Sequence, residues 1–228
     1  MLILAFDTTA GGLSVALLND DEVLAKAAVS NSNSQSELLI PEIEKILRKQ
    51  KIWYQNLDLI VATNGPGSFT GSRIGLSCAR IIKAATNLPL ILVNGLEAMA
   101  FAHRGQNKNI FVTLDASGGE FFCAEFRESE IVQEPCLVKA EELAAIAPKK
   151  IFFLCGSGKK AAAEALSTNC RPTLVARSIA GFELNEDEDV LNADLVGLLG
   201  LKKFRNGEVS NNLDPLYLRG PRIEARKK

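Results

Sequence analysis

The feature that most constrains the fold of this chain is an internal repeat of an apolar strand that ends in an aspartate and a small residue. The segment MLILAFDTT opens the chain, and the segment NIFVTLDAS at residues 109–117 has the same pattern. In each half, two further strand-like stretches follow, then a helical pattern and one more apolar strand. This repetition predicts a duplicated β-β-β-α-β-α unit, and hence an α/β fold of two related lobes. The alternative is that the match reflects only the strand–aspartate endings common among α/β proteins.

The first half contains every element of that unit. Three strands joined by tight turns are predicted to form an antiparallel meander, with Asp20 and Asp21 at the second turn. A helix follows, because apolar side chains recur at helical spacing on one face. The ranges predicted for this half are strands at 2–7, 13–19, 22–29, 57–62 and 88–94, and helices at 34–51, 72–86 and 95–104.

The second half repeats the order with shorter elements. Its predicted strands are 109–117, 119–126, 130–138 and 150–158, with a helix at 140–147, an acidic stretch at 183–190 and a final helix at 190–205. We expect residues 1–104 to form an N-terminal lobe and residues 105–189 a smaller C-terminal lobe. The C-terminal helix within 190–228 is expected to pack back on the first lobe.

Composition excludes several classes of protein. With 228 residues and 47% of them hydrophobic, the chain can bury a sizeable core, and its net charge of -1 provides no overall positive field for nucleic acid. The N-terminus has no basic region before its short apolar run, and no stretch approaches the roughly 18 apolar residues of a membrane span. Five cysteines without a CxxC pair are typical of a reducing compartment. We therefore expect a cytoplasmic protein that does not enter a membrane.

The glycine-rich segment NGPGSFTGSRIG (residues 64–75) follows an apolar strand directly. It is not a Walker loop, because a Walker loop has lysine and then Ser or Thr after its last glycine. Here Gly71 is followed by Ser72 and Arg73. Two interpretations remain open. The loop could bind an anion at the start of the next helix, aided by Arg73. Alternatively it is a strand-to-helix turn capped by Ser68 or Thr70, which the lack of a dedicated lysine favours.

Other chemical motifs are missing from the sequence. His103 is the only histidine, so a paired histidine metal site is excluded, and no GxSxG motif indicates a nucleophilic serine. Asp7 and Asp115 end the two repeated strands, where a carboxylate can hold hydrated magnesium or accept hydrogen bonds from turn amides. Both interpretations remain open. No catalytic residue and no metal site are predicted.

Several segments together resemble the TsaB (YeaZ) family. They are GPGSFTGSRIG, LAFDTT, SELLIPEIEKIL, LDASGGEFF, CGSGK and DPLYLRG, and they extend over nearly the whole chain. The resemblance implies the actin-like ATPase fold (ASKHA, ribonuclease H-like) and a role in making tRNA threonylcarbamoyladenosine. It further implies a heterodimer with a catalytic TsaD-like paralogue, a TsaE-like ATPase as another partner, a homodimer when alone, and contact with tRNA through the complex. The chain alone is expected to need no cofactor, whereas ATP and Mg²⁺ belong to the complex.

The resemblance also implies a degenerate nucleotide cleft. Its expected residues are Asp7, Gly65, Gly67, Thr70, Asp115, Gly156 and Gly158. Two positions depart from the family pattern: Gln35 stands where members commonly have histidine, and Ser117 where they commonly have arginine.

A docking surface is expected on the first two long helices, which carry more apolar positions than one seam requires. Small residues four apart, Gly75 and Ala79, would let another backbone come close. The expected interface residues are Leu39, Ile43, Leu47, Arg73, Gly75, Cys78, Ala79 and Ile82. The alternative is that the rest of the domain covers both helices. The basic tail (Arg219, Arg222, Arg226, Lys227 and Lys228) either contacts tRNA phosphates or is a solvated terminus.

Three functions compete at this point. The first is a noncatalytic dimerisation subunit of a tRNA-modifying complex. The second is an autonomous ATPase or small-molecule kinase that uses Asp7 and the glycine loop. The third is a peptidase, suggested by kinship with so-called glycoproteases and disfavoured by the absence of a metal pair or triad.

Overall fold

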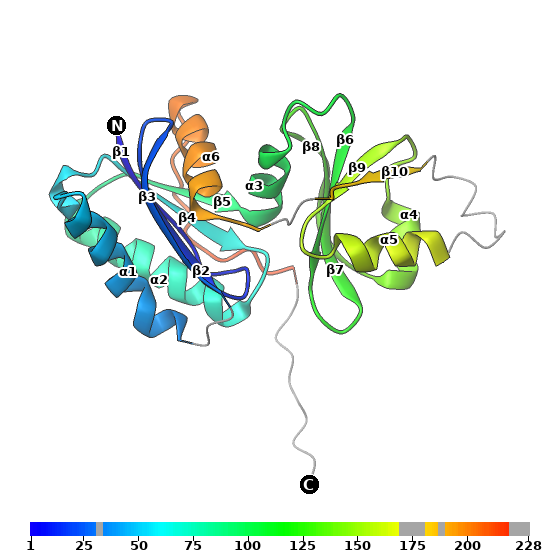
Figure 1. The fold of residues 1–228 in the computed structure, drawn as a ribbon, viewed down its shortest axis with the longest axis horizontal. Coiled ribbons are helices and arrows are strands. Elements are labelled where there is room, and N and C mark those ends of the chain that lie inside the picture. Colours follow the sequence, from blue (N-terminus) through cyan, green and yellow to red (C-terminus); the bar gives the residue numbers. More distant parts are fainter. Residues whose placement is uncertain (31–33, 169–180, 187–189, 219–228) are drawn as a thin grey trace, which may run out of the picture.

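Two five-stranded sheets with the same strand order organise the structure, a computed structural model that describes residues 1–30, 34–168, 181–186 and 190–218. The first sheet has the order β3-β2-β1-β4-β5, and the second, taken from its other edge, has the order β8-β7-β6-β9-β10. Figure 1 shows the two sheets side by side, with helices flanking each. The matching order confirms the repeat predicted from the sequence.

The first sheet is mixed. Strand β1 pairs antiparallel with β2 and parallel with β4, and β2 pairs antiparallel with β3 as the predicted meander requires. The central strands are buried on both faces, which explains why they are continuous apolar runs rather than alternating ones. The bounds are β1 Leu2–Asp7, β2 Leu13–Asn19, β3 Glu22–Val29, β4 Leu59–Gly65 and β5 Leu90–Asn94.

The second sheet repeats this pairing. Strand β6 is antiparallel to β7 and parallel to β9, and β7 is antiparallel to β8. A parallel strand at the far edge, β10, completes it. The bounds are β6 Asn109–Asp115, β7 Glu120–Arg127, β8 Glu130–Lys139, β9 Phe152–Cys155 and β10 Phe182–Leu184.

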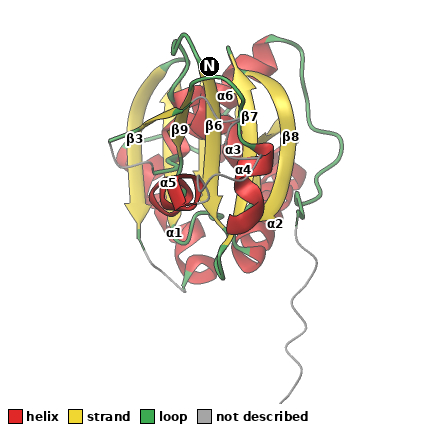
Figure 2. Ribbon diagram, turned by 90° about the vertical axis from the view of Figure 1, so that its right-hand side faces the viewer, coloured by secondary structure: helices red, strands yellow, loops and turns green. Residues whose placement is uncertain are grey.

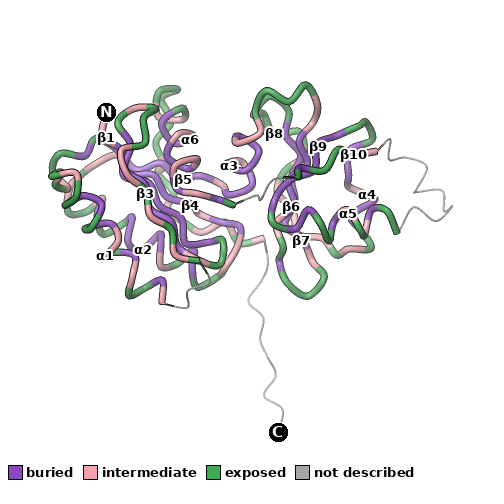
Figure 3. The backbone as a smooth tube through the Cα atoms, viewed as in Figure 1, coloured by how far each residue is buried: buried purple, intermediate pink, exposed green. Residues whose placement is uncertain are grey.

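The helices fill three layers around the sheets. Helices α1 and α2 cover the outer face of the first sheet, α3 and α6 lie between the sheets, and α4 and α5 cover the outer face of the second. Figure 2 shows α4 and α5 in front of the second sheet, and Figure 3 shows the burial of both sheets. The bounds are α1 Gln35–Lys49, α2 Phe69–Thr86, α3 Gly95–Ala102, α4 Leu143–Ile146, α5 Lys159–Thr168 and α6 Ala193–Arg205, with 3-10 turns at Tyr54–Asn56 and Ala140–Glu142.

Several boundaries differ from those predicted. Helix α2 begins at Phe69 rather than at residue 72, because Ser68 is its N-cap and its side chain accepts a hydrogen bond from the Gly71 amide. Strand β9 is shorter than predicted, and the helix predicted at 140–147 is divided between a 3-10 turn and the four-residue α4. No range was predicted for α5 or β10.

Some predictions fall outside the described residues. These are the basic tail after residue 218, Cys170, and residues 187–189 of the acidic stretch. The residue boundaries of the two lobes stay a prediction, although α6 does pack on β1, β2, β4 and β5 of the first sheet. Among the described residues, no helix has the length and apolar character needed to cross a membrane.

Candidate functional site

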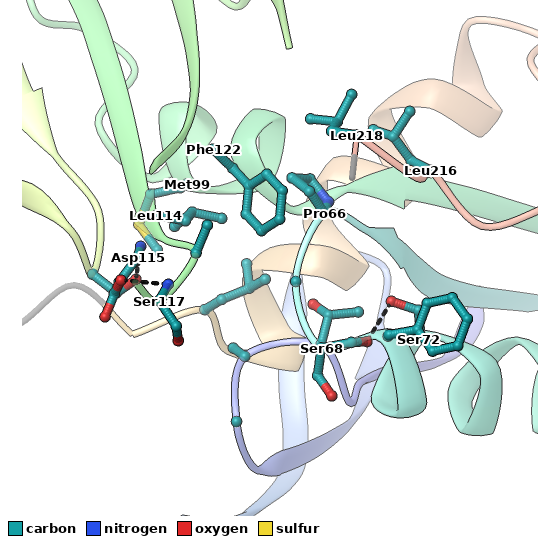
Figure 4. Close-up of a pocket in the computed structure, with 18 of the residues that line it drawn as sticks. Pro66, Ser68, Ser72, Met99, Leu114, Asp115, Ser117, Phe122, Leu216 and Leu218 are labelled. Atoms are coloured by element: carbon teal, nitrogen blue, oxygen red, sulfur yellow. Dashed lines mark hydrogen bonds between the residues drawn. The ribbon is translucent and has the colours of Figure 1, made fainter. Parts of the chain in front are cut away.

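A cavity of about 760 Å³ lies between the two sheets and takes its walls from both halves of the chain. In Figure 4, Phe122 from β7 faces Pro66 from the glycine loop, and the C-terminal segment supplies Leu216 and Leu218 along one side. The lining residues are Thr9, Ala10, Gly11, Pro66, Gly67, Ser68, Phe69, Ser72, Met99, Leu114, Asp115, Ala116, Ser117, Phe122, Ser157, Val190, Leu191, Leu216, Tyr217 and Leu218.

The chemistry of this lining is mostly apolar. Asp115 is the one charged side chain among the described lining residues, and it is acidic. A nucleoside triphosphate needs compensating cations, which known phosphate sites supply through Lys or Arg side chains. The described lining therefore does not fit a triphosphate by itself.

The two repeated aspartates have different environments. Asp7 is buried, and its carboxylate accepts hydrogen bonds from the Thr9 amide and hydroxyl, the Ala10 amide and the Thr63 hydroxyl. Burial raises the pKa of Asp7, while the hydrogen bonds from Thr63, Thr9 and Ala10 act in the opposite direction. Its oxygens are thus engaged by the turn that follows β1 and by Thr63 of β4, which favours the hydrogen-bonding interpretation of this residue.

Asp115, by contrast, is exposed and lines the cavity. One of its oxygens accepts a hydrogen bond of 2.7 Å from the amide of Ser117, which has a φ of 62°. Ser117 therefore shapes the turn after β6 and also lines the cavity. Ser117, which departs from the pattern of the family that the sequence resembles, thus lies in the wall of the cavity.

The glycine loop packs tightly against the turn after β1. A Cβ atom on Gly67 would lie 2.4 Å from the Thr9 carbonyl oxygen, and one on Gly71 would lie 1.9 Å from that of Thr8. The Ser68 amide donates to the Thr9 carbonyl at 2.9 Å. Glycine is required because two backbones meet here.

Arg73 is not available for an anion in the cavity. Its guanidinium carbon lies 3.8 Å from the centre of the Phe69 ring, and its Nε donates to the Tyr217 hydroxyl at 2.9 Å. With the Gly71 amide already bonded to Ser68, these contacts favour the turn interpretation of the loop. Ser68, not Thr70, is the cap.

The structure separates the remaining predicted cleft residues. Gly67 and Asp115 line the cavity, Asp7 is buried and bonded to the lining residue Thr9, and Thr70 is exposed on the outer surface. Gly65, Gly156 and Gly158 do not line the cavity, and each approaches other protein atoms. Gly156 would place a Cβ 2.3 Å from the Thr113 carbonyl oxygen, as Gly67 does with Thr9 in the first half.

Gln35 has a structural partner. Its side-chain amide donates to the Gly12 carbonyl at 2.9 Å and to the Thr8 carbonyl at 3.4 Å, and the residue is buried. It therefore fastens the start of α1 to the turn after β1.

A second hollow of about 480 Å³ lies on the outer surface between α1 and α2. Its apolar walls are exposed: Ile81 to 66%, Phe69 to 42% and Ile40 to 39%. We call this hollow the outer groove. Its lining residues are Ser36, Leu39, Ile40, Phe69, Thr70, Arg73, Ile74, Ser77, Cys78 and Ile81.

The predicted interface residues need correction. Of the eight, exposed Arg73 lines the groove, while Leu39 and Cys78 form part of its buried floor. The others, Ile43, Leu47, Gly75, Ala79 and Ile82, are buried inside the protomer. The apolar stripe of each helix packs on its own sheet, so a partner could contact only the flank of that stripe.

Gly75 shows why these small and apolar residues are buried inside the protomer. A Cβ atom there would lie 2.5 Å from the Thr8 hydroxyl oxygen, so its small size makes room for a side chain of the same protomer. The expected interface residues leave out Ile40, Ile81 and Phe69, which line the groove, and the expected cleft residues leave out Phe122 and Tyr217, which line the cavity. The surplus of apolar positions on the first two long helices was the available indication of the groove.

Metal ligands do not gather in the described parts of the chain: no three His, Cys, Asp or Glu side chains there are placed to hold an ion.

Comparisons with known proteins add family information to this geometry. The family model described as "TsaD: tRNA N6-adenosine threonylcarbamoyltransferase" matches residues 24–182. The tRNA threonylcarbamoyladenosine biosynthesis protein TsaB of Bacillus subtilis (strain 168) is 33% identical over 122 residues, which cover 54% of this chain and 53% of the relative. The chain thus spans about half the length of the curated relatives it matches.

Solved structures extend the comparison over most of the chain. YeaZ from Pseudomonas aeruginosa superposes with a TM-score of 0.73 at 22% identity, over 95% of this chain and 99% of that one. The ROK hexokinase from Thermus thermophilus gives a TM-score of 0.54 at 13% identity, over 90% and 100%. These likenesses establish the actin-like ATPase fold, with its two mixed sheets and flanking helices.

Proposed function

Because the chain belongs to the tRNA N6-adenosine threonylcarbamoyltransferase (TsaD) family and is related to its TsaB (YeaZ) proteins, we propose that it is a noncatalytic dimerisation subunit. In this role it serves tRNA threonylcarbamoyladenosine biosynthesis. Its proposed partner is a TsaD-like catalytic subunit. A TsaE-like ATPase joins the same complex, and tRNA is contacted through the assembly.

The observation that carries this proposal is the outer groove on α1 and α2. Large apolar side chains on both walls are exposed in the protomer, and exposed apolar surface that is contiguous and hollowed is typical of protein interaction sites. Ile40 and Ile81 come from different helices and would both be buried by one inserted helix or helix pair. The groove also has polar lining residues, Ser36, Thr70 and Ser77. Protein–protein interfaces commonly have such a polar rim around an apolar centre.

The cavity supports the noncatalytic part of the proposal. Its described lining has one carboxylate and no basic side chain, and the arginine nearest to the glycine loop is stacked on Phe69. Transfer of a charged acyl group requires charge stabilisation that these residues do not provide. The catalytic groups would therefore come from the partner.

The same groove supports a homodimer when the partner is missing. Two copies related by a two-fold axis would each present the groove to the other, because an isologous interface uses one patch twice. Heterodimer formation would then compete with homodimer formation for a single surface.

The test is reconstitution from purified components. We expect the chain alone to modify no tRNA, and to restore threonylcarbamoylation when it is added to the TsaD-like subunit, the TsaE-like ATPase, ATP and the threonylcarbamoyl donor. Modification at an unchanged rate without the chain would refute the proposal. ATP hydrolysis by the chain alone, abolished in Asp7→Ala, would instead favour the autonomous ATPase.

A further inference from the structure

Two cysteines face each other across neighbouring strands of the second sheet. Cys123 on β7 and Cys136 on β8 are direct partners in the antiparallel register. Both side chains pack on the face of the sheet that α4 and α5 cover, so they lie on the same side. A hairpin separates the two cysteines in the sequence, so their pairing is evident only from the register of β7 and β8.

Their separation suits a disulfide. Directly opposed residues in an antiparallel pair have Cα atoms about 4.5–5.5 Å apart. Disulfides span about 4.4–6.8 Å between Cα atoms, a range that includes the spacing of directly opposed residues. The Cys136 thiol donates to the Cys123 carbonyl oxygen at 3.7 Å, which places its sulfur against the partner strand.

The two thiols differ in their access to solvent. Cys123 is fully buried, whereas Cys136 is half-buried on the edge strand β8. The side-chain amide of Gln133 donates to the Cys136 sulfur at 3.6 Å. Cys136 is therefore the more accessible residue of the pair, and Cys123 is the buried one.

The electrostatic environment agrees with this division. Interaction with the adjacent Cys123 side chain lowers the pKa of Cys136, burial opposes that effect, and the Gln133 amide adds to it. The same interaction, together with burial, raises the pKa of Cys123. Cys136 is thus the thiol that more readily forms the reactive thiolate.

We propose that Cys136 is an oxidation site that hydrogen peroxide or an alkyl hydroperoxide converts to a disulfide with Cys123. In the first step the Cys136 sulfur attacks the peroxide, an S–O bond forms, the O–O bond breaks, and the leaving oxygen takes a proton. In the second step the Cys123 sulfur attacks the Cys136 sulfenic acid, the S–S bond forms, and the S–O bond breaks to release water with the Cys123 proton. Two thiols are oxidised, and one peroxide is reduced.

The other described cysteines lack this arrangement. Burial raises the pKa of Cys78 to about 12, which keeps it in the unreactive thiol form. Cys155 packs in the core between the two sheets, on the opposite face of the second sheet. Cys78 therefore serves as a control within the same chain.

The bond would affect the wall of the cavity. Phe122 precedes Cys123 on β7 and points to the other face of the sheet, where it lines the cavity. A covalent link would fix the edge strand β8 to β7 beside that ring. The oxidised protein should therefore melt at a higher temperature than the reduced protein, because the link restricts the unfolded chain.

The test treats the reduced full chain with excess hydrogen peroxide, followed by thiol titration and peptide mass mapping. We expect the loss of two thiols and a peptide linked through Cys123 and Cys136. In Cys123→Ser, a dimedone-reactive sulfenic acid should accumulate at Cys136. In Cys136→Ser, Cys123 should stay reduced, while Cys78→Ser and Cys170→Ser should behave as wild type.

Three results would each overturn the proposal. They are a linked peptide that contains Cys170 in place of either residue, equal oxidation of Cys123 in Cys136→Ser, and five free thiols in the native protein after treatment that oxidises glutathione completely.

Discussion

Thr8 packs closely against the helix that follows the glycine loop. The Thr8 hydroxyl donates to the Gly71 carbonyl at 2.7 Å, and the missing Cβ of Gly75 leaves room for it. This contact joins the end of β1 to the first two turns of α2. It explains a glycine that the sequence alone suggested was an interface residue.

Gly75→Ala should therefore destabilise the protein although alanine favours helices. Its Cβ would lie 2.5 Å from the Thr8 hydroxyl oxygen, and overpacking of this kind costs about 1–3 kcal/mol. Urea unfolding measures the loss. Ser77→Ala, on the exposed face of the same helix, should change the free energy of unfolding by less than about 0.5 kcal/mol. Equal stability of both variants and wild type would contradict the contact.

The contribution of Asp7 to the free energy of unfolding is expected to decline as pH rises. Burial holds its folded pKa above the ordinary 3.8, so between these two values the folded state keeps a proton that the unfolded state has lost. The contribution of Asp7 to the free energy of unfolding is then greatest below pH 3.8 and is lost as pH rises through the folded pKa. The free energy of unfolding of wild type, minus that of the non-titrating Asp7→Asn, should decrease over that window. An increase with pH would mean that hydrogen bonding outweighs burial.

At the scale of elements, α2 depends on its first turn. The Ser68 hydroxyl accepts from the Gly71 amide at 3.1 Å, and the first turn has no acidic side chain to assist it. Ser68→Ala should lower the free energy of unfolding by about 1 kcal/mol. Thr70→Ala, exposed in the same turn, should leave it nearly unchanged; a reversed order in thermal melts would identify Thr70 as the cap.

The presence of the central strands was more predictable than the exact ends of strands and helices. The apolar runs of β1, β4 and β6 are buried on both faces, so composition alone indicates them. The start of α2 was placed three residues late, because Phe69 and Thr70 look like loop residues until the cap at Ser68 is seen. The division of the predicted 140–147 helix depends on how that segment packs beside α5 and β7, which no local pattern specifies.

Across both lobes, the sequence repeat predicted the sheet topology but neither the cavity nor the outer groove. Asp7 and Asp115 occupy matching positions, yet one is buried in its own turn and the other is exposed in the cavity. The cavity also takes Leu216 and Leu218 from the far end of the chain. The outer groove depends on which flank of each helix the sheet leaves uncovered, a property of packing angles rather than of sequence period.

If the outer groove binds the catalytic partner, its affinity can be measured by calorimetric titration of the chain into the TsaD-like subunit. Ile81→Glu would place a charge at an apolar position that is 66% exposed, and should weaken association about tenfold or more. Val132→Glu is the matched control, since Val132 is 54% exposed on β8 of the second sheet and should leave affinity unchanged. Wild-type affinity in Ile81→Glu, with both variants folded, would contradict the account.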